Sequence, residues 1–247
     1  MKIQGNTILI TGGGSGIGRA LARRWHDLGN QVIVAGRRQE ALDETIAGRE
    51  GMFAYTIDID DPAAIETFAA ELVERHPDLN VLINNAGVMR YEDVAARRDL
   101  KDAEETVTTN LLGPIRLTNA LVDHLVSRPN SAIVNVTSGL AFVPFPKAPT
   151  YSATKAALHS YTLALRHSLK GRVEVVELAP PAVQTELTPG QSTRENYQPL
   201  EEFIDEAMRL WQAQPTPAEI NVERVGFLRF AERDRQVDEA LEMLGSL

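Results

Sequence analysis

Tyr151 and Lys155 are the residues whose types and spacing first suggest chemistry in this chain. On a helix, a separation of four residues places two side chains on one face, about 5 to 6 Å apart at their Cβ atoms. Free tyrosine titrates near pH ~10, and a neighbouring positive charge favours the phenolate, so the pair predicts a general acid or base. The same spacing also occurs on solvated helix faces, which leaves an ordinary surface pair as the alternative.

The elements that position this pair are predicted from an alternation of short apolar runs with longer helical patterns. The expected strands are 7–11, 31–35, 53–57, 81–83, 132–136 and 173–178. A long helix is expected over 102–126, and another helix carries Tyr151 and Lys155. Repeated βα alternation without a repeated sequence predicts an α/β fold with a doubly wound parallel sheet, in which ligands bind beyond the carboxyl ends of the strands.

Size and composition fit one soluble α/β domain. The 247 residues include 43% hydrophobic and 24% charged residues, which is ordinary for a globular protein. No apolar run approaches the roughly 18 residues of a membrane span, and the first residues lack the apolar core of a signal peptide. We therefore expect a cytoplasmic protein with no membrane contact.

Charge and cysteine content exclude other classes of site. Cysteine is absent, so the chain has no disulfide, no thiol nucleophile and no cysteine metal site, and we predict no metal. With 25 basic and 34 acidic residues, the net charge of −9 argues against a broad nucleic-acid surface. A small anionic ligand is still compatible with this charge, because a few amides and arginines bind it locally.

A glycine-rich loop, TGGGSGIG, follows the first predicted strand. Gly12, Gly16 and Gly18 let the backbone approach a pyrophosphate, while the next helix presents free N–H groups and the positive end of its dipole. The spacing is GxxxGxG and does not fit the dinucleotide fingerprint GxGxxG. No GK[ST] follows, which disfavours an ATP-binding P-loop. A tight strand-to-helix turn without a ligand is the alternative.

Two arginines end the second predicted strand, where dinucleotide folds contact the adenosine ribose. An acidic residue there accepts from a 2′-hydroxyl, whereas Arg37 and Arg38 suit a 2′-phosphate and so favour NADP(H) over NAD(H). A solvated helix start is the alternative, most of all for Arg38. Asp58 ends the third strand and either accepts from an adenine amino group or caps the helix that begins at Pro62.

Taken together and in order, these motifs resemble the short-chain dehydrogenase/reductase family in its compact branch. The resemblance covers residues 6–187 and rests on TGGGSGIG, NNAG at 84–87, Asn110, Ser138 and YSATK at 151–155. More narrowly, VTSGLAF, YSATKAALHS, APPAVQTEL and NVERVGFLRFAE resemble the DltE-like oxidoreductases. The family resemblance implies a Rossmann fold and an oxidoreductase that interconverts a carbonyl and an alcohol.

The resemblance implies four catalytic residues. Tyr151 is the general acid/base, and Lys155 lowers the pKa of that phenol and hydrogen-bonds the nicotinamide ribose. Ser138 lies 13 residues before Tyr151 and stabilises the substrate oxygen. Asn110 interrupts the long helix and holds a water that links Lys155 to solvent. Without the resemblance, Asn110 would be an ordinary polar residue within a helix.

The cofactor contacts that we expect lie at the strand ends and on the catalytic helix. They are Gly12, Ser15, Gly16, Ile17, Gly18, Arg37, Arg38, Asp58, Ile59, Asn85, Ala86, Gly87, Tyr151, Lys155, Pro180, Val183 and Thr185. Asn85 has an alternative role, which is to tie neighbouring strands together. The family usually has Pro-Gly where this chain has Pro180 and Pro181, which removes one backbone donor from that loop.

The end of the chain departs from the compact family pattern. The spacing of Val225, Leu228, Val237, Leu241 and Leu244 predicts that 221–247 is mostly helical, so we expect six strands and a helical C-terminal tail in a single NAD(P)-binding domain over 1–247.

Three further expectations concern the surroundings of the site. Residues 188–216 are expected to include a substrate lid, with a slack surface loop as the alternative. Apolar pocket candidates are Met89, Phe142, Val143 and Phe145, for each of which core packing is the default. A homodimer through the helices 102–126 and 151–169 is expected, because the strand that often builds a tetramer interface is missing.

We therefore predict an NADP(H)-dependent oxidoreductase that acts on a small carbonyl or alcohol substrate. A catalytically silent nucleotide-sensing or scaffold protein on the same fold is the alternative, although such proteins typically lose the tyrosine or the lysine. An epimerase or dehydratase of the extended branch is disfavoured, because residues 187–247 are too few for the larger substrate domain of that branch.

Overall fold

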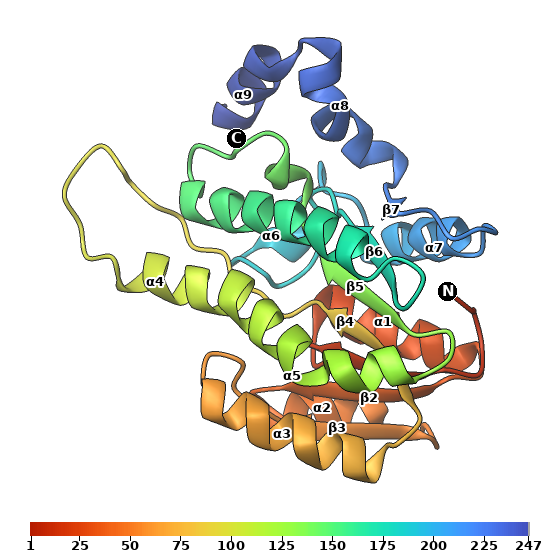
Figure 1. Ribbon diagram of the computed structural model, residues 1–247. Helices are drawn as coiled ribbons and strands as arrows, with labels where there is room; N and C mark the ends of the chain where they lie inside the picture. The colour runs from red at the N-terminus through yellow and green to blue at the C-terminus, as the bar shows by residue number, and fades with distance from the viewer. Residues whose placement is uncertain (247) are drawn as a thin grey trace.

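Seven parallel strands form one sheet in the computed structural model, which describes residues 1–246 (Figure 1). The strands are β1 (Thr7–Thr11), β2 (Gln31–Gly36), β3 (Met52–Thr56), β4 (Leu79–Asn84), β5 (Ala132–Val136), β6 (Glu174–Leu178) and β7 (Glu219–Ile220). Their order is β3-β2-β1-β4-β5-β6-β7. The chain reverses its direction of winding between β1 and β4, which places the ligand crevice of such a sheet above these two strands.

The predicted doubly wound fold is confirmed, and the six predicted strands match β1 to β6 within two residues at each end. The expected count of six strands is wrong. The seventh strand pairs Glu219 with Glu177 and Ile220 with Leu178. Two residues are too few to show the alternation or the apolar run by which a strand is detected in a sequence.

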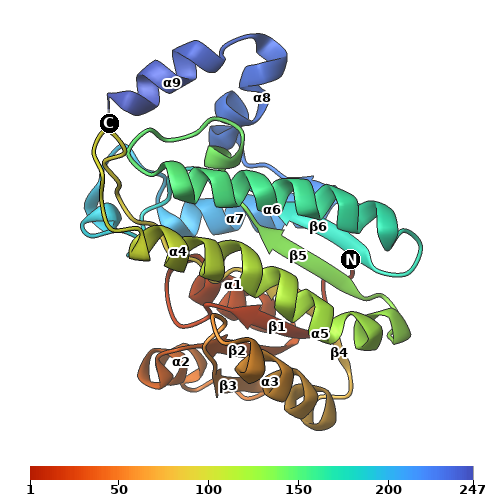
Figure 2. The ribbon, with the colours of Figure 1, turned by 60° about the vertical axis from the view of Figure 1, so that its left-hand side comes forward.

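Helices cover both faces of the sheet (Figures 1 and 2). One face carries α1 (Gly16–Asp27), α2 (Gln39–Ile46) and α7 (Leu200–Trp211). The other carries α3 (Pro62–Arg75), α5 (Gly113–Ser127) and α6 (Pro149–Ser168), and α4 (Lys101–Val107) leads into α5. Short 3₁₀ turns span Gly139–Ala141, Gln191–Thr193 and Glu223–Val225.

Helix α7 is part of the core, although the sequence placed it within the predicted lid. Its residues Phe203, Ile204 and Trp211 are fully buried, and the Trp211 ring meets Trp25 of α1 edge-on at 5.4 Å between centroids. Two buried indoles contribute a large apolar area, and that contact holds the helix on the sheet. The segment left for a lid is therefore 188–199.

The helical prediction for the end of the chain is confirmed for the described residues. Helices α8 (Gly226–Asp234) and α9 (Val237–Gly245) follow β7, and Leu247 lies outside the described part. We call residues 226–245 the C-terminal arm. The arm packs against the loop before α6, where Val143 and Phe145 are buried with Ala231 and Leu244 (Figures 1 and 2). Within residues 1–246, no helix combines the length and the apolar character needed to cross a membrane.

Candidate active site

A cavity of about 450 Å³ opens at the carboxyl ends of β1, β2, β4, β5 and β6. Every predicted site residue except Asn110 lines it: Gly12, Ser15, Gly16, Ile17, Gly18, Arg37, Arg38, Asp58, Ile59, Asn85, Ala86, Gly87, Ser138, Tyr151, Lys155, Pro180, Val183 and Thr185. The strand ends thus bring together groups that are up to 173 positions apart in the chain (12 to 185).

The glycine loop is close-packed against its neighbours. A Cβ atom on Gly18 would lie 2.3 Å from the Gly12 carbonyl oxygen, and one on Gly12, whose φ is +67°, would lie 2.9 Å from the Ala86 Cα. Only glycine fits at these two positions. Helix α1 begins directly after the loop without a side-chain cap, so its first N–H groups face the cavity and suit a pyrophosphate.

The end of β4 is tied to the end of β1 beside this loop. The Asn85 side chain donates to the Thr11 carbonyl oxygen at 2.9 Å, and the Thr11 hydroxyl accepts from the backbone N–H groups of Asn85 and Ala86 at 3.1 Å. The strand-tying role that the sequence left open for Asn85 is therefore observed. Its backbone still lines the cavity beside Ala86 and Gly87.

Tyr151 and Lys155 lie in the first two turns of α6, and both are buried. The Lys155 Nζ atom lies 5.6 Å from the centre of the Tyr151 ring and donates to the Val136 carbonyl oxygen at 2.8 Å. Burial lowers the pKa of Lys155 to about 8 and raises the pKa of Tyr151 to about 12, a rise that the Ser138 hydroxyl opposes. In the chain alone, the pKa of this phenol is therefore raised and not lowered as the sequence predicted, and the phenol is protonated at neutral pH.

Ser138 is presented by the end of β5. Its Oγ accepts from the Leu140 N–H at 3.1 Å, which caps the short turn Gly139–Ala141, and the Gly139 N–H donates to the Pro180 carbonyl oxygen at 2.9 Å. The serine hydroxyl is thereby fixed between the β5 and β6 ends, beside Tyr151. This arrangement is suited to binding an oxygen atom that a protonated phenol also contacts.

Asn110 interrupts the long helix as the sequence predicted. A π-helical turn (Thr108–Leu112) separates α4 from α5 and turns the fully buried Asn110 side chain towards β4. There Asn110 Oδ1 accepts from the Val88 N–H and its Nδ2 donates to the Val88 carbonyl oxygen, both at 2.8 Å, and Nδ2 also reaches Thr154 on α6. Its side chain bridges β4 and α6 and does not itself line the cavity.

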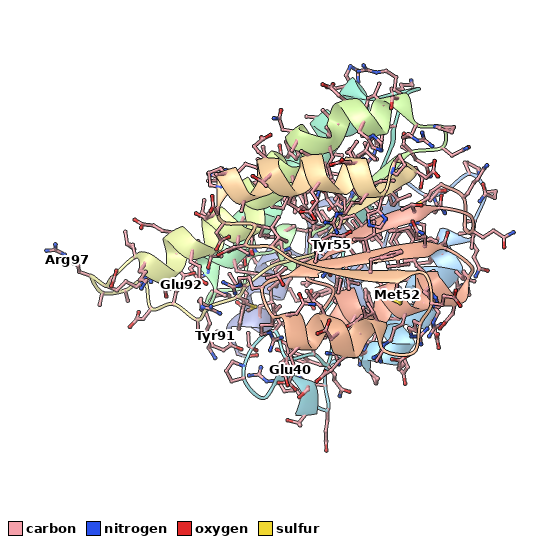
Figure 3. The ribbon with its side chains drawn as sticks, turned by 90° about the horizontal axis from the view of Figure 1, so that it is seen from below. Glu40, Met52, Tyr55, Tyr91, Glu92 and Arg97 are labelled. Carbon is pink, nitrogen blue, oxygen red and sulfur yellow. The ribbon has the colours of Figure 1, made fainter. Side chains whose placement is uncertain are left out.

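Glu92 contacts α6, the helix that carries Tyr151 and Lys155, and no sequence motif pointed to it. Its carboxylate accepts from the N–H and the hydroxyl of Thr150, at 3.0 and 2.7 Å, and pairs with Arg98. Figure 3 shows Glu92 on the loop between β4 and α4, whose outer end carries Arg97. Ala148, at the helix N-cap, has no capping side chain. Glu92 therefore caps α6 one residue before Tyr151, from 58 positions away.

The residues beyond β2 and β3 border the same cavity. Arg37 and Arg38 follow β2, and Asp58 lies across from them. The cap of α3 is Asp61, whose carboxylate accepts from the N–H groups of Ala63 and Ala64. Because Asp61 caps the helix, the capping role that the sequence left open for Asp58 is not used.

The loop after β6 closes another side of the cavity. Val183 pairs with Gln198 in a short parallel bridge, and the Gln191 side chain donates to the Val183 carbonyl oxygen at 2.8 Å and to the Thr185 hydroxyl at 3.1 Å. Gln191 also lines the cavity, although the sequence gave no signal for it. These bonds place Thr185 against the glycine loop, where its side chain lies 3.4 Å from the position of a Cβ on Gly16.

The four apolar pocket candidates do not line the cavity. Val143 and Phe145 are buried beneath the C-terminal arm, and Met89 packs against the same cluster. The Phe142 ring lies between His159, at 5.0 Å, and the Arg229 guanidinium, at 4.6 Å. Core packing, which the sequence left as the default for each of these residues, is found for Met89, Val143 and Phe145, whereas Phe142 is partly exposed and stacks with His159 and Arg229.

Comparison with known proteins agrees with this geometry. Residues 6–196 match the family model described as short chain dehydrogenase. The chain is 43% identical over 190 residues to the oxidoreductase DltE of Bacillus subtilis, covering 76% of this chain and 75% of that protein. It is 38% identical over 185 residues to a serine 3-dehydrogenase of Agrobacterium fabrum and 35% over 186 residues to sulfoacetaldehyde reductase 2 of Chromohalobacter salexigens, covering 73–74% of each chain.

Two solved structures with bound nucleotide are similar over most of the chain. A short chain dehydrogenase from Burkholderia cenocepacia in complex with NADP has a TM-score of 0.82 at 26% identity and covers 97% of this chain and 98% of its own. A closed form of serine dehydrogenase complexed with NADP⁺ has a TM-score of 0.77 at 28% identity and covers 87% and 92%.

Proposed function

Because the chain belongs to the short-chain dehydrogenase family, we propose that it is an NADP(H)-dependent oxidoreductase that interconverts a carbonyl and an alcohol. The observation that carries this proposal is the meeting of Tyr151, Ser138 and Lys155 in one cavity with the glycine loop. A protonated phenol, a fixed hydroxyl and an anion-binding helix start are the three groups that such a reaction needs from the protein.

The glycine loop leaves room in the cavity for the pyrophosphate of a dinucleotide. Side chains at Gly12 and Gly18 would collide with backbone, and the space they leave lies at the start of α1. When bound, the nicotinamide supplies the hydride. Arg37 and Arg38 are the groups we assign to the 2′-phosphate, which supports NADP(H) over NAD(H).

The chain's own residues move and hold the proton. With a pKa of about 12, Tyr151 is protonated at neutral pH and donates to the carbonyl oxygen as negative charge develops there. Ser138 donates a second hydrogen bond to the same oxygen. Lys155 is mostly protonated at neutral pH, since its pKa is about 8, and it stabilises the phenolate left after transfer. Asn110 holds α6 in register with the β4 end, so that these groups stay aligned.

The substrate that we propose carries an acid group one carbon away from the reacting carbon. Serine and sulfoacetaldehyde, for which two relatives are named, both have this layout. Arg194, on the segment 188–199, donates to the hydroxyls of Tyr197 at 2.9 Å and Tyr91 at 3.4 Å, and within residues 1–246 it makes no ion pair. Tyr91 belongs to the loop between β4 and α4 (Figure 3), so Arg194 bridges two loops next to the cavity, although neither residue lines it. This supports a lid role for 188–199.

Tyr151→Phe tests the catalytic assignment. Removing the proton donor is expected to lower kcat by a factor of about 10² to 10⁴ with any substrate found by following NADPH absorbance, while NADPH binding is retained. Tyr161→Phe, on the same helix, is the matched control and is expected to keep turnover. Near wild-type turnover in Tyr151→Phe would sink the proton-transfer role. Tight NADPH binding without turnover of any carbonyl or alcohol would favour the nucleotide-sensing alternative.

The assembly that we propose is a homodimer through α4, α5 and α6. Leu163 on α6 is 45% exposed and Val107 on α4 is 36% exposed, which supports apolar contacts on this side. Light scattering is expected to give twice the chain mass of 27.2 kDa. A stable tetramer would contradict the assignment.

A further inference from the structure

Glu105 on α4 joins two arginines at the rim of the cavity. Its carboxylate oxygens lie 3.4 and 3.5 Å from Arg90 Nη2, and one of them lies 4.0 Å from Arg37 Nη1. Arg37 and Arg90 both line the cavity, yet Arg37 follows β2 and Arg90 follows β4. The carboxylate thus holds guanidinium groups from two different strand ends beside one another.

The three side chains leave one positive charge in excess. Arg37 is 54% exposed, Arg90 is 42% exposed and Glu105 is 33% exposed, so the pairs are weak enough to exchange partners. A phosphate carries up to two charges and three acceptor oxygens, and guanidinium groups bind phosphate with two parallel hydrogen bonds. A carboxylate with a single charge is a weaker partner for the same two arginines.

The other acids of the rim have different partners. The Asp60 carboxylate accepts from the Thr109 hydroxyl at 2.7 Å, and Asp58 Oδ1 accepts from the Asp60 N–H at 3.1 Å. Glu186 lines the cavity as well, and none of these three carboxylates pairs with an arginine side chain within the described part of the chain. Glu105 is therefore the acid that competes for Arg37 and Arg90.

We propose that Arg90 joins Arg37 in binding the 2′-phosphate of NADP(H), and that Glu105 weakens this preference by competing for the two guanidinium groups. The inference rests on the proposed function only in requiring a dinucleotide in the cavity. Arg90 thereby becomes a second determinant of cofactor choice, and it lies outside the β2 end where sequence reasoning looks for such determinants.

Glu105→Gln tests the competition, with Glu104→Gln as the matched control. Both changes remove one negative charge from α4, but Glu104 is exposed and makes no ion pair within residues 1–246. Dissociation constants for NADPH and NADH are measured by calorimetry on the full chain. Glu105→Gln is expected to tighten NADPH binding on the order of 3- to 10-fold and to leave NADH within about twofold, whereas Glu104→Gln changes neither.

Arg90→Gln tests the second phosphate contact, with Arg97→Gln as its control. Arg97 lies at the outer end of the same loop and is exposed (Figure 3). Arg90→Gln is expected to weaken NADPH binding about 5- to 20-fold without weakening NADH, and the loss should shrink at high salt. The double variant Arg90→Gln/Glu105→Gln should regain part of this loss through Arg37 alone.

The outcomes separate this inference from the proposed function. The NADPH-to-NADH affinity ratio of the unmodified chain tests the proposed cofactor preference. The change of that ratio in the Glu105 and Arg90 variants tests the roles of these two residues. An unchanged ratio in both Glu105→Gln and Arg90→Gln, with thermal melting showing folded variants, would overturn the inference even if NADPH binds tightly. A shifted ratio would support it even in a chain that prefers NADH.

Discussion

Residues 6–196 and residues 197–246 make different contributions to the structure. The first region matches the family model and carries the strands whose ends bear the glycine loop, Ser138 and Tyr151. The second lies outside that match, contributes a two-residue strand and consists mainly of helices. The site therefore belongs to the first region. The second region does not line the cavity, and its helix α7 and C-terminal arm pack against the first region.

The second region is attached to the first through the buried helix α7 and the pairing of β7 with β6, and an ion pair within it joins β7 to the C-terminal arm. Trp211 of α7 packs on Trp25, and Glu219 of β7 makes two hydrogen bonds with Arg229 of the C-terminal arm, at 2.6 and 2.9 Å. Leu228, next to Arg229, lies 3.1 Å from the position of a Cβ on Gly139. The arm thus contacts the residue that follows Ser138, although no residue of the arm lines the cavity.

A row of polar side chains crosses the border between the two regions. One in-register position of each of four neighbouring strands is polar: Asn84, Asn135, Glu177 and Glu219. The fully buried Glu177 accepts from the Thr137 hydroxyl at 2.6 Å and pairs with His159 of α6 at 2.8 Å. Two carboxylates on adjacent strands repel one another, and each has its own hydrogen-bonding partner, His159 for Glu177 and Arg229 for Glu219. Helix α7 is held by buried apolar residues together with ion pairs to Arg24, whereas the arm combines a small apolar cluster with the Glu219–Arg229 pair.

Trp211→Ala has the largest expected effect on stability. It tests whether α7, the longest helix of the second region, is part of the core. Truncating a fully buried tryptophan leaves a cavity, so the free energy of unfolding should fall by about 3–5 kcal/mol in urea denaturation. Trp25→Ala, on the other side of the contact, should cost a similar amount. A loss below about 1 kcal/mol for Trp211→Ala alone would show that α7 is only loosely attached.

Gly18→Ala and Gly226→Ala compare one helix glycine from each region. The new Cβ on Gly18 meets the Gly12 carbonyl oxygen, so we expect a loss of about 1–3 kcal/mol and weaker NADPH binding. Nothing lies within 4 Å of a Cβ on Gly226, whose φ is −53°, so alanine there should stabilise by up to about 1 kcal/mol. Thermal melting measures the stability of both variants, and calorimetry measures their NADPH binding. Equal effects of the two substitutions would contradict the predicted difference between the two glycines.

Glu219→Gln tests the charge pairing between β7 and the arm. Hydrogen bonds from Arg229 lower the pKa of Glu219 from 4.5 to about 2. A carboxyl whose pKa falls on folding contributes stability that is present above pH 4.5 and is lost as the pH drops towards 2. The variant should therefore show a flatter stability profile in this window. Glu223→Gln, on an exposed acid before the arm, should keep the wild-type profile.

Much of the first region could be predicted because its signals are local. The strand runs, the glycine loop and the four-residue step from Tyr151 to Lys155 depend on neighbouring residues only. The interruption of the long helix at Asn110 was also predicted, through the family resemblance, and a π-helical turn is found there. In the second region the helical spacing of the arm was visible, but the strand Glu219–Ile220 was too short to show a pattern.

The sequence by itself determined the fold class and which residues are brought to the strand ends, since the order of the elements dictates where those ends meet. Only the tertiary structure decided that α7 is core, that Glu92 caps the catalytic helix and that Glu105 joins Arg37 to Arg90. It also decided that the pKa of Tyr151 lies above that of free tyrosine, because burial raises the pKa of the phenol to about 12. Desolvation and contacts between distant segments arise only when the layers pack, and residue spacing does not record them.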